Sequence, residues 1–162
     1  MPSPAADSVT RTTLTDMVIA YATALDSRDW PLMRSLLTDP VEIDYSSMGS
    51  IRETLAVEDW LRRLNTLSGF DATQHVVTNF RVEVDGERAT CTSYVDALHF
   101  LTDGGRNHVA HACGVYVHEF VLTAGGWRIR KATFHLRGHQ NGAQAFQEAF
   151  ARAREIAGAG RS

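Results

Sequence analysis

Cysteine, long apolar runs and basic clusters are all scarce in this chain of 162 residues. The two cysteines, Cys91 and Cys113, lack metal-motif spacing and are too few for a disulfide framework, which favours a reducing cytoplasm. The apolar runs are too short to span a membrane, and the segment "MPSPAADSVTRTTLTD" lacks the apolar core of a signal peptide. No basic stripe accompanies the formal net charge of −3. We therefore expect neither a membrane nor a nucleic acid as partner.

The motifs of several enzyme classes are missing as well. No G-x-S-x-G elbow supports a serine hydrolase, and "DGGR" and "AGGW" are typical of hairpin turns rather than phosphate-binding loops. His108 and His111 are three residues apart, which on a strand places them on opposite faces, where they cannot hold one metal ion together. We expect no metal and no cofactor, although histidines brought together by folding remain an alternative. Five of the seven histidines are interpreted as structural: His108, His111, His118, His135 and His139.

The first part of the chain has the spacing of amphipathic helices. Apolar residues three and four apart predict a helix from about Ser8 to Ala24. A second short helix is predicted to end at Pro40, and "TLAVEDWLRRLNTLS" returns to helical spacing after a short strand in "VEIDYSSMG". A last helix is expected from about Ala143 to Ala157.

Two aspartates stand between the first two predicted helices, in "YATALDSRDW". Asp29 directly precedes Trp30 and Pro31, where a carboxylate can accept hydrogen bonds from the free N–H groups that begin a helix. Asp26 has no such role in the pattern. It is a solvated residue at a helix end, a partner of Arg28, or a functional residue.

Four long strands are predicted after Thr73, separated by the turn signals "DGE", "DGG" and "AGG". In "RATCTSYVDALHFLT" the smaller and less polar face carries Val95, Ala97 and His99, so we expect this face to point inward. Helices followed by long antiparallel strands predict an α+β fold with one core. A curved sheet closed over the helices would leave a pocket at its open end.

The order of these motifs resembles the scytalone dehydratase and SnoaL-like branch of the nuclear transport factor 2-like superfamily. The resemblance is carried by "YATALDSRDW", "EIDYSS", "TQHVV", "GERATCTSYVDALHF" and "GGWRIRKATF", and it covers the chain from about Leu14 to Arg137. It implies a cone-shaped α+β barrel, in which N-terminal helices pack in a strongly curved mixed sheet that encloses a pocket, with a C-terminal helix. The domain is expected at residues 8–157, with flexible tails at 1–7 and 158–162. A homo-oligomer, dimer or trimer, is implied too.

The resemblance also implies site residues. It places Asp26 where an aspartate holds a general-base histidine, and His75 at that histidine. His99 matches, with a one-residue shift, a second histidine that helps to remove the leaving hydroxyl. Tyr45 matches a tyrosine that holds a water against the substrate carbonyl.

The substrate-recognising half of the site departs from the family pattern. Leu25 replaces a carbonyl-binding tyrosine, and Gly114 and Tyr116 replace a serine and an asparagine. Scytalone itself is therefore not the expected substrate. The residues predicted to contact substrate are Leu25, Val95, Ala97, Gly114, Tyr116 and Phe134.

Acid–base chemistry by these groups predicts a cofactor-independent lyase. We expect dehydration of a small cyclic or aromatic hydroxy-ketone, as in secondary metabolism, with the Asp26–His75 pair as the base. The same pair could drive an isomerisation or a polyketide ring closure instead. A non-catalytic ligand-binding or dimerisation module is the remaining alternative, because one fold serves many functions.

Overall fold

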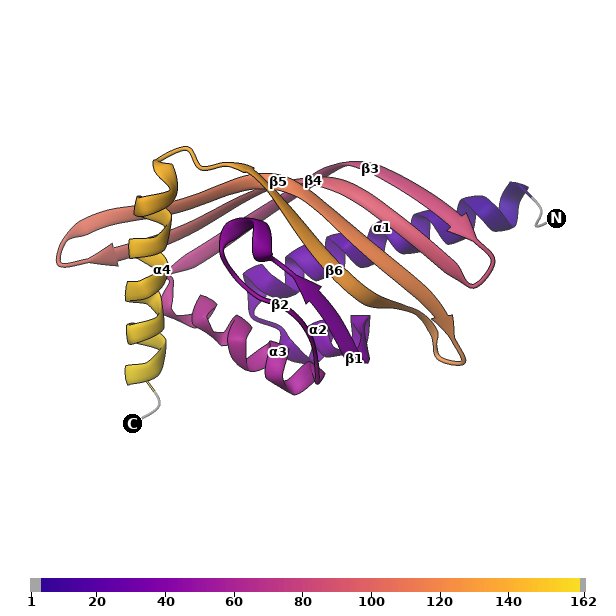
Figure 1. Cartoon of the computed structure of the whole chain (residues 1–162), viewed down its shortest axis with the longest axis horizontal. Coiled ribbons are helices and arrows are strands. Elements are labelled where there is room, and N and C mark those ends of the chain that lie inside the picture. Colours follow the sequence, from indigo (N-terminus) through magenta and orange to yellow (C-terminus); the bar gives the residue numbers. More distant parts are fainter. Residues whose placement is uncertain (1–3, 161–162) are drawn as a thin grey trace.

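Long antiparallel strands form the second half of the chain, and helices with two short strands form the first half (Figure 1). The computed structural model describes residues 4–160. The helices are α1 (Pro4–Ser27), α2 (Trp30–Leu36), α3 (Val57–Leu64) and α4 (Gly142–Ala159), with 3-10 turns η1 (Ser46–Met48) and η2 (Asn65–Gly69). The strands are β1 (Leu37–Asp44), β2 (Arg52–Leu55), β3 (Ala72–Asp85), β4 (Arg88–Asp103), β5 (Arg106–Thr123) and β6 (Gly126–Gly138).

The strands form one mixed sheet in the order β2-β1-β6-β5-β4-β3. Strand β1 runs parallel to β6, and the other neighbouring pairs are antiparallel. The register is interrupted in β3, between Thr78 and Arg81, and twice where β5 pairs with β6. Such irregularities bend a strand and increase its twist, which suits a sheet that must curve around helices.

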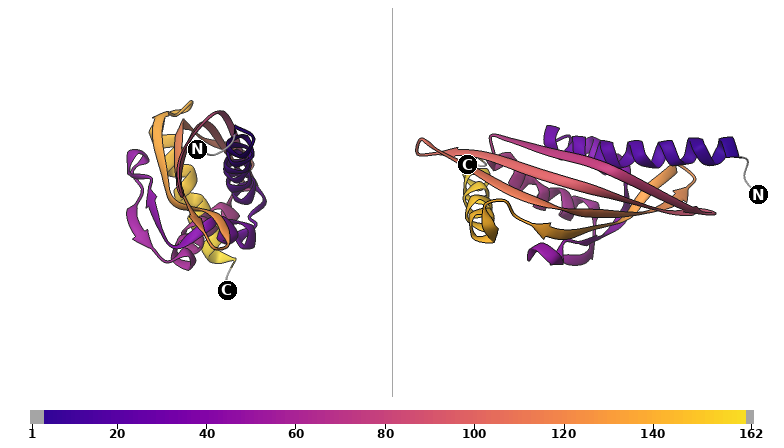
Figure 2. Two further views of the ribbon diagram at one scale, coloured as in Figure 1. Left: turned by 90° about the vertical axis from the view of Figure 1, so that its right-hand side faces the viewer. Right: turned by 90° about the horizontal axis from the view of Figure 1, so that it is seen from above.

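Helices α1, α2 and α3 lie on the concave side of the sheet, and α4 crosses one end of the molecule (Figures 1 and 2). The core lies between these layers. Its largest fully buried side chains include Tyr21, Phe120, Leu14 and Met33. Burial alternates along β4, as the sequence predicts. The side chains on its inward face are all buried: Ala89, Cys91, Ser93, Val95, Ala97 and His99.

The α+β fold with a curved mixed sheet and a C-terminal helix is confirmed, as are the four long strands. The prediction that Pro40 ends the second helix is wrong, because α2 ends at Leu36 and Pro40 lies within β1. Leu37 pairs with Ile129 of β6, and this pairing makes Leu37 the first residue of a strand although its spacing in the sequence is helical. The predicted third helix begins later than expected, since Arg52–Leu55 is the edge strand β2.

The chain ends differ slightly from the predicted boundaries. Helix α1 already begins at Pro4 and α4 continues to Ala159. Residues 1–3 and 161–162 of the predicted tails lie outside the described residues. Between residues 4 and 160 no helix combines the length and apolarity needed to cross a bilayer.

Helix α4 is fixed to the rest of the molecule by a close backbone contact. A Cβ atom on Gly69, at the end of η2, would lie 1.9 Å from the carbonyl oxygen of Ala153. Real atoms cannot approach so closely, and a backbone carbonyl cannot rotate away as a flexible side chain would. Glycine at position 69 therefore sets how near α4 lies to the helical half.

Gly69→Ala should lower the free energy of unfolding by about 2 kcal/mol or more, because overpacking typically costs ~1–3 kcal/mol even where side chains can adjust. Gly158→Ala is the matched control, since a Cβ there meets nothing within 4 Å and alanine is the better helix former. Urea denaturation of both variants checks this. Equal stability of Gly69→Ala and the wild type would contradict the close contact.

Candidate active site

The last turn of α1 positions the first candidate side chain, Asp26. The helix ends when Arg28 adopts a left-handed conformation (φ 55°), and Asp29 then caps α2 by accepting from the N–H of Leu32 at 2.9 Å, as predicted. Arg28 does not pair with Asp26. Its guanidinium donates to two backbone carbonyl oxygens, of Leu67 and Phe70. The carboxylate of Asp26 is thus left to face strand β3.

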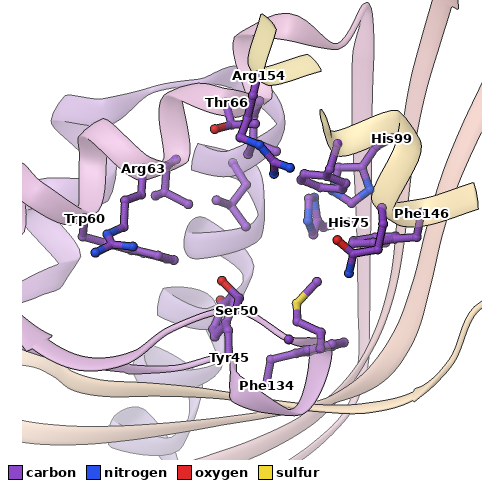
Figure 3. A pocket seen from close by; sticks show the side chains of 18 of the residues that line it. Tyr45, Ser50, Trp60, Arg63, Thr66, His75, His99, Phe134, Phe146 and Arg154 are labelled. Carbon is purple, nitrogen blue, oxygen red and sulfur yellow. The ribbon is translucent and has the colours of Figure 1, made fainter. Parts of the chain in front are cut away.

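Asp26 and His75 form a hydrogen-bonded pair. The Nδ1 atom of His75 lies 2.7 Å from Oδ1 of Asp26, and the backbone N–H of His75 donates to Oδ2 at 2.8 Å. The hydroxyl of Thr73 donates to Oδ1 at 2.9 Å. Because the carboxylate accepts from Nδ1–H, the lone pair of the neutral imidazole is on Nε2. The His75 ring lines a cavity, so this geometry suits a general base (Figure 3).

Asp26 stays ionised in this setting. Burial tends to raise its pKa, but the side-chain and backbone hydrogen bonds from His75, the charge of a protonated His75 and the Thr73 hydroxyl together lower the pKa below its ordinary value. A carboxylate that is already charged can stabilise the imidazolium formed when Nε2 takes a proton.

The cavity beside His75 has a volume of about 340 Å³. Its walls come from α1, α3, the turns η1 and η2, the sheet and α4, so every layer of the fold contributes. Aromatic rings form much of the lining: Tyr45, Trp60, Tyr116, Phe134, Phe146 and Phe150. Such walls fit a flat apolar ligand, with a few polar groups to orient it.

His99 stands next to His75 and is buried. The two ring centroids are 5.2 Å apart with the planes nearly perpendicular. Nδ1 of His99 lies 3.1 Å from the carbonyl oxygen of Ala110 and so carries the hydrogen, which leaves Nε2 as an acceptor. Burial, with a smaller effect of His75, lowers the pKa of His99 to about 3. A neutral His99 has no proton on Nε2 to give to a leaving hydroxyl, which argues against the acid role that the resemblance implied.

Tyrosines gather deeper in the cavity wall. The hydroxyl oxygens of Tyr21 and Tyr45 are 2.9 Å apart, and the Tyr45 ring stacks on that of Tyr116 at a centroid distance of 6.3 Å. Burial raises the pKa of Tyr21 to about 12 and the pKa values of Tyr45 and Tyr116 still further above the ordinary range. All three phenols therefore keep their protons, and Tyr45 and Tyr116 can donate hydrogen bonds to an oxygen in the cavity.

Comparison with known proteins assigns this arrangement to a family. Residues 7–133 match the SnoaL-like domain. The chain belongs to the SnoaL-like family. The SnoaL-like assignment, to which the sequence motifs pointed, is thereby confirmed.

Solved structures share the SnoaL-like fold. Kfla4162 of Kribbella flavida has a TM-score of 0.80 and 28% identity, covering 87% of this chain and 99% of that one. A candidate scytalone dehydratase from Novosphingobium aromaticivorans has a TM-score of 0.70 at 18% identity, with coverage of 83% and 88%. The hexachlorocyclohexane dehydrochlorinase LinA-type3 from Novosphingobium barchaimii has a TM-score of 0.69 at 20% identity, with coverage of 82% and 89%.

The predicted contact residues of this SnoaL-like protein divide into two groups. Leu25, Ala97, Tyr116 and Phe134 line the cavity. Val95 and Gly114 do not. Helix α1 packs against β3 and β4, so most of the inward face of β4 is core, and only its end near Ala97 opens to the cavity.

Gly114 acts on the cavity through its neighbour. A Cβ at this position would lie 2.2 Å from the carbonyl oxygen of His135 and 2.9 Å from two ring carbons of Phe134. Glycine here lets β6 and the Phe134 ring approach β5. Gly114 therefore shapes the cavity wall formed by Phe134 and does not itself contact a ligand in the cavity.

Several site residues escaped the sequence reasoning. Thr73 shares a strand face with His75 two positions later, a signal that could have marked it as the third donor to Asp26. Phe146 and Phe150 are four apart on α4, the spacing of one helix face. Nothing in their pattern indicates that this face covers the cavity. The same holds for two arginines at the rim, Arg63 and Arg154.

A second buried histidine lies beneath the tyrosines. His118 has no exposed surface and its ring centroid is 4.8 Å from that of Tyr21. In the described part of the chain neither of its ring nitrogens has a hydrogen-bond partner. Burial lowers the pKa of His118 to about 3. The folded protein thus keeps it neutral at pH values where an unfolded histidine takes up a proton.

His118→Phe should stabilise the protein at pH 7 by about 1 kcal/mol or more, because two unpaired buried nitrogens are removed. The wild type should lose stability as the pH falls from about 6.5, the unfolded pKa, towards 3, at up to ~1.4 kcal/mol per pH unit for this group. The variant should show a decline that is shallower by this amount. Urea unfolding at pH 7, 6 and 5 measures both slopes, and identical slopes would contradict the assignment.

Proposed function

We propose that this SnoaL-like protein is a lyase that removes water from a small cyclic or aromatic hydroxy-ketone, with groups of its own chain as the only catalysts. The observation that carries the proposal is the Asp26–His75 pair, held by three hydrogen bonds at the wall of an aromatic cavity. A pair that served only to stabilise the fold would not need a ring nitrogen directed at empty space.

The chemistry follows from the positions of the groups. Nε2 of His75 takes the proton from the carbon next to the substrate carbonyl, and the electron pair moves into an enolate. The phenols of Tyr45 and Tyr116 donate hydrogen bonds to its oxygen. The electrons then return to form the carbon–carbon double bond as the β-hydroxyl leaves. That hydroxyl takes the proton from the His75 imidazolium, directly or through water, so that water is released and His75 is neutral again.

The size of the cavity and the structural neighbours of the chain both support a small substrate that undergoes an elimination reaction. A cavity of about 340 Å³ with aromatic walls suits a molecule of one or two rings. A candidate scytalone dehydratase and a dehydrochlorinase share this fold, so lyase-type enzymes occur among its structural neighbours. At 18% and 20% identity these likenesses show the fold alone.

Isomerisation is the second candidate, and His99 favours it. An isomerase takes a proton from one carbon and returns it to another, so it needs no separate acid for a leaving group. The neutral His99 can only accept through Nε2, so it supplies no such acid, which favours the isomerase over the dehydratase. A ring closure would use the same base.

Asp26→Asn is an unusually direct test, because three donors point at the carboxylate. An asparagine side chain has one acceptor oxygen and one amide nitrogen. If the nitrogen replaces Oδ2, it meets the backbone N–H of His75. If it replaces Oδ1, it meets Nδ1 and forces the imidazole proton onto Nε2, where it blocks the base.

Asp26→Asn and His75→Ala should each lower kcat/KM by ~10²- to 10⁴-fold, the usual contribution of a positioned base. A suitable substrate is 3-hydroxy-1-tetralone, a two-ring β-hydroxy-ketone that gives 1-naphthol on loss of water and is followed by fluorescence. Asp29→Asn is the matched control: it removes the same charge three residues away and keeps the helix cap.

Three outcomes separate the candidates. Turnover that Asp26→Asn abolishes and Asp29→Asn preserves supports the lyase. Deuterium exchange at C2 of 1-tetralone without any 1-naphthol from the hydroxy-ketone supports the isomerase. Neither activity, or equal activity of the two asparagine variants, contradicts catalysis by the pair.

Tyr45→Phe should lower kcat by about 10²-fold through the loss of a donor to the enolate oxygen. Tyr21→Phe should lower it by less than about tenfold, since Tyr21 contacts Tyr45 but does not line the cavity. Steady-state kinetics with the same hydroxy-ketone compares them. An unchanged kcat in Tyr45→Phe would remove this residue from the mechanism.

A further inference from the structure

The rim of the cavity carries positive charge with no acidic group to balance it inside. Two arginines, Arg63 of α3 and Arg154 of α4, are among the residues that line the cavity, and in the described part of the chain no aspartate or glutamate lines it. Asp26 lies behind His75 and is already engaged by three donors. A ligand in this cavity therefore meets cations and neutral groups only.

The two arginines are not equivalent. The guanidinium of Arg63 donates to both carboxylate oxygens of Glu53, at 3.1 and 3.4 Å, so its charge is locally balanced. Within residues 4–160 the guanidinium of Arg154 has neither a hydrogen-bond nor an ion-pair partner. Its neighbour on the same helix, Arg152, is held by Asp103 and Glu155 instead. Arg154 is the rim cation that is free to bind an anion.

The backbone position of Arg154 is also well fixed. It follows Ala153, the residue whose carbonyl packs against Gly69, so the backbone that carries Arg154 is in close contact with η2. Figure 3 shows its side chain entering the cavity on the side where His75 and His99 lie, with Thr66 close to it and Tyr45 across the cavity. A molecule lying between Tyr45 and Arg154 would pass His75.

We propose that the substrate of this site carries a carboxylate group, which Arg154 binds at the cavity mouth while the ketone oxygen faces Tyr45. That the substrate contains a ketone rests on the proposed function. The contact between Arg154 and the carboxylate concerns binding alone and can be tested without turnover. Arginine matches a carboxylate with two parallel N–H···O bonds, and charge-assisted bonds of this kind are the stronger ones. One unpaired guanidinium suits a single negative charge on an otherwise apolar molecule.

The test compares two flat ligands of nearly equal size, one anionic and one neutral. 2-Naphthoate and 2-naphthamide have nearly the same shape, and both fit a two-ring cavity. Isothermal titration calorimetry at low ionic strength should give the wild type a roughly tenfold preference for 2-naphthoate, a value tempered by the exposure of Arg154 to solvent. Arg154→Gln should abolish that preference and leave 2-naphthamide affinity unchanged.

Arg62→Gln is the control for net charge. Arg62 stands next to Arg63 in α3, pairs with Asp59 within the same helix and does not line the cavity. The wild-type preference should persist in this variant. Circular dichroism and thermal unfolding of both variants confirm that the fold is retained.

The outcomes distinguish this inference from the proposed reaction, because binding needs no turnover. Equal affinities in the wild type, absence of 2-naphthoate binding up to millimolar concentration, or a preference that survives Arg154→Gln would each overturn the role of Arg154. A preference lost only in Arg154→Gln would establish the anion subsite even if no elimination is found. Activity on a hydroxy-ketone without any carboxylate preference would leave the lyase standing and refute the subsite.

Discussion

Three hydrogen bonds converge on the carboxylate of Asp26, and they connect the end of the first helix to the first long strand. Two of the donors belong to His75 and the third to Thr73, so both the backbone and the side chains of β3 are held by one group. The contact fixes the tautomer of His75 and the direction of its free nitrogen. Helix α1 ends one residue beyond Asp26. Arg28, in its left-handed conformation, provides that end.

Close backbone approaches then give the cavity its shape. Gly114 lets β6 and the ring of Phe134 come near β5, and Gly69 lets α4 settle on η2. In both places a single methyl group would push apart elements that form cavity walls. The cavity is therefore a consequence of how tightly its surroundings pack, and its volume depends on residues that no ligand would touch. Substitutions at such positions would alter binding while the reacting groups stay unchanged.

The sequence predicted the elements better than the details of the site. The alternation in β4 and the turn signals located the long strands because burial on one face leaves a period of two in the sequence. Pro40, Thr54 and Leu55 were misassigned because pairing with distant strands, which a local pattern does not show, decided their conformation. Asp26 and His75 were found through family motifs, since nothing local says that residues so far apart will meet. Val95 followed the correct face of β4, but the pattern does not tell where core ends and cavity begins.

The sequence could not identify Arg154 as a cavity residue either, because an exposed arginine on a helix has the same sequence pattern whether it faces bulk water or a ligand. Its helix, α4, also lies beyond the region that matches the SnoaL-like domain, which ends at residue 133. The Asp26–His75 pair and the tyrosines lie within that region, whereas the cavity-lining residues Phe146, Phe150 and Arg154 lie beyond it. Under the proposed function, the proton-transfer groups and the part of the cavity wall that α4 provides thus belong to separate stretches of the chain. Exchange of the C-terminal helix would then change one wall of the cavity and leave the contact between Asp26 and His75 in place.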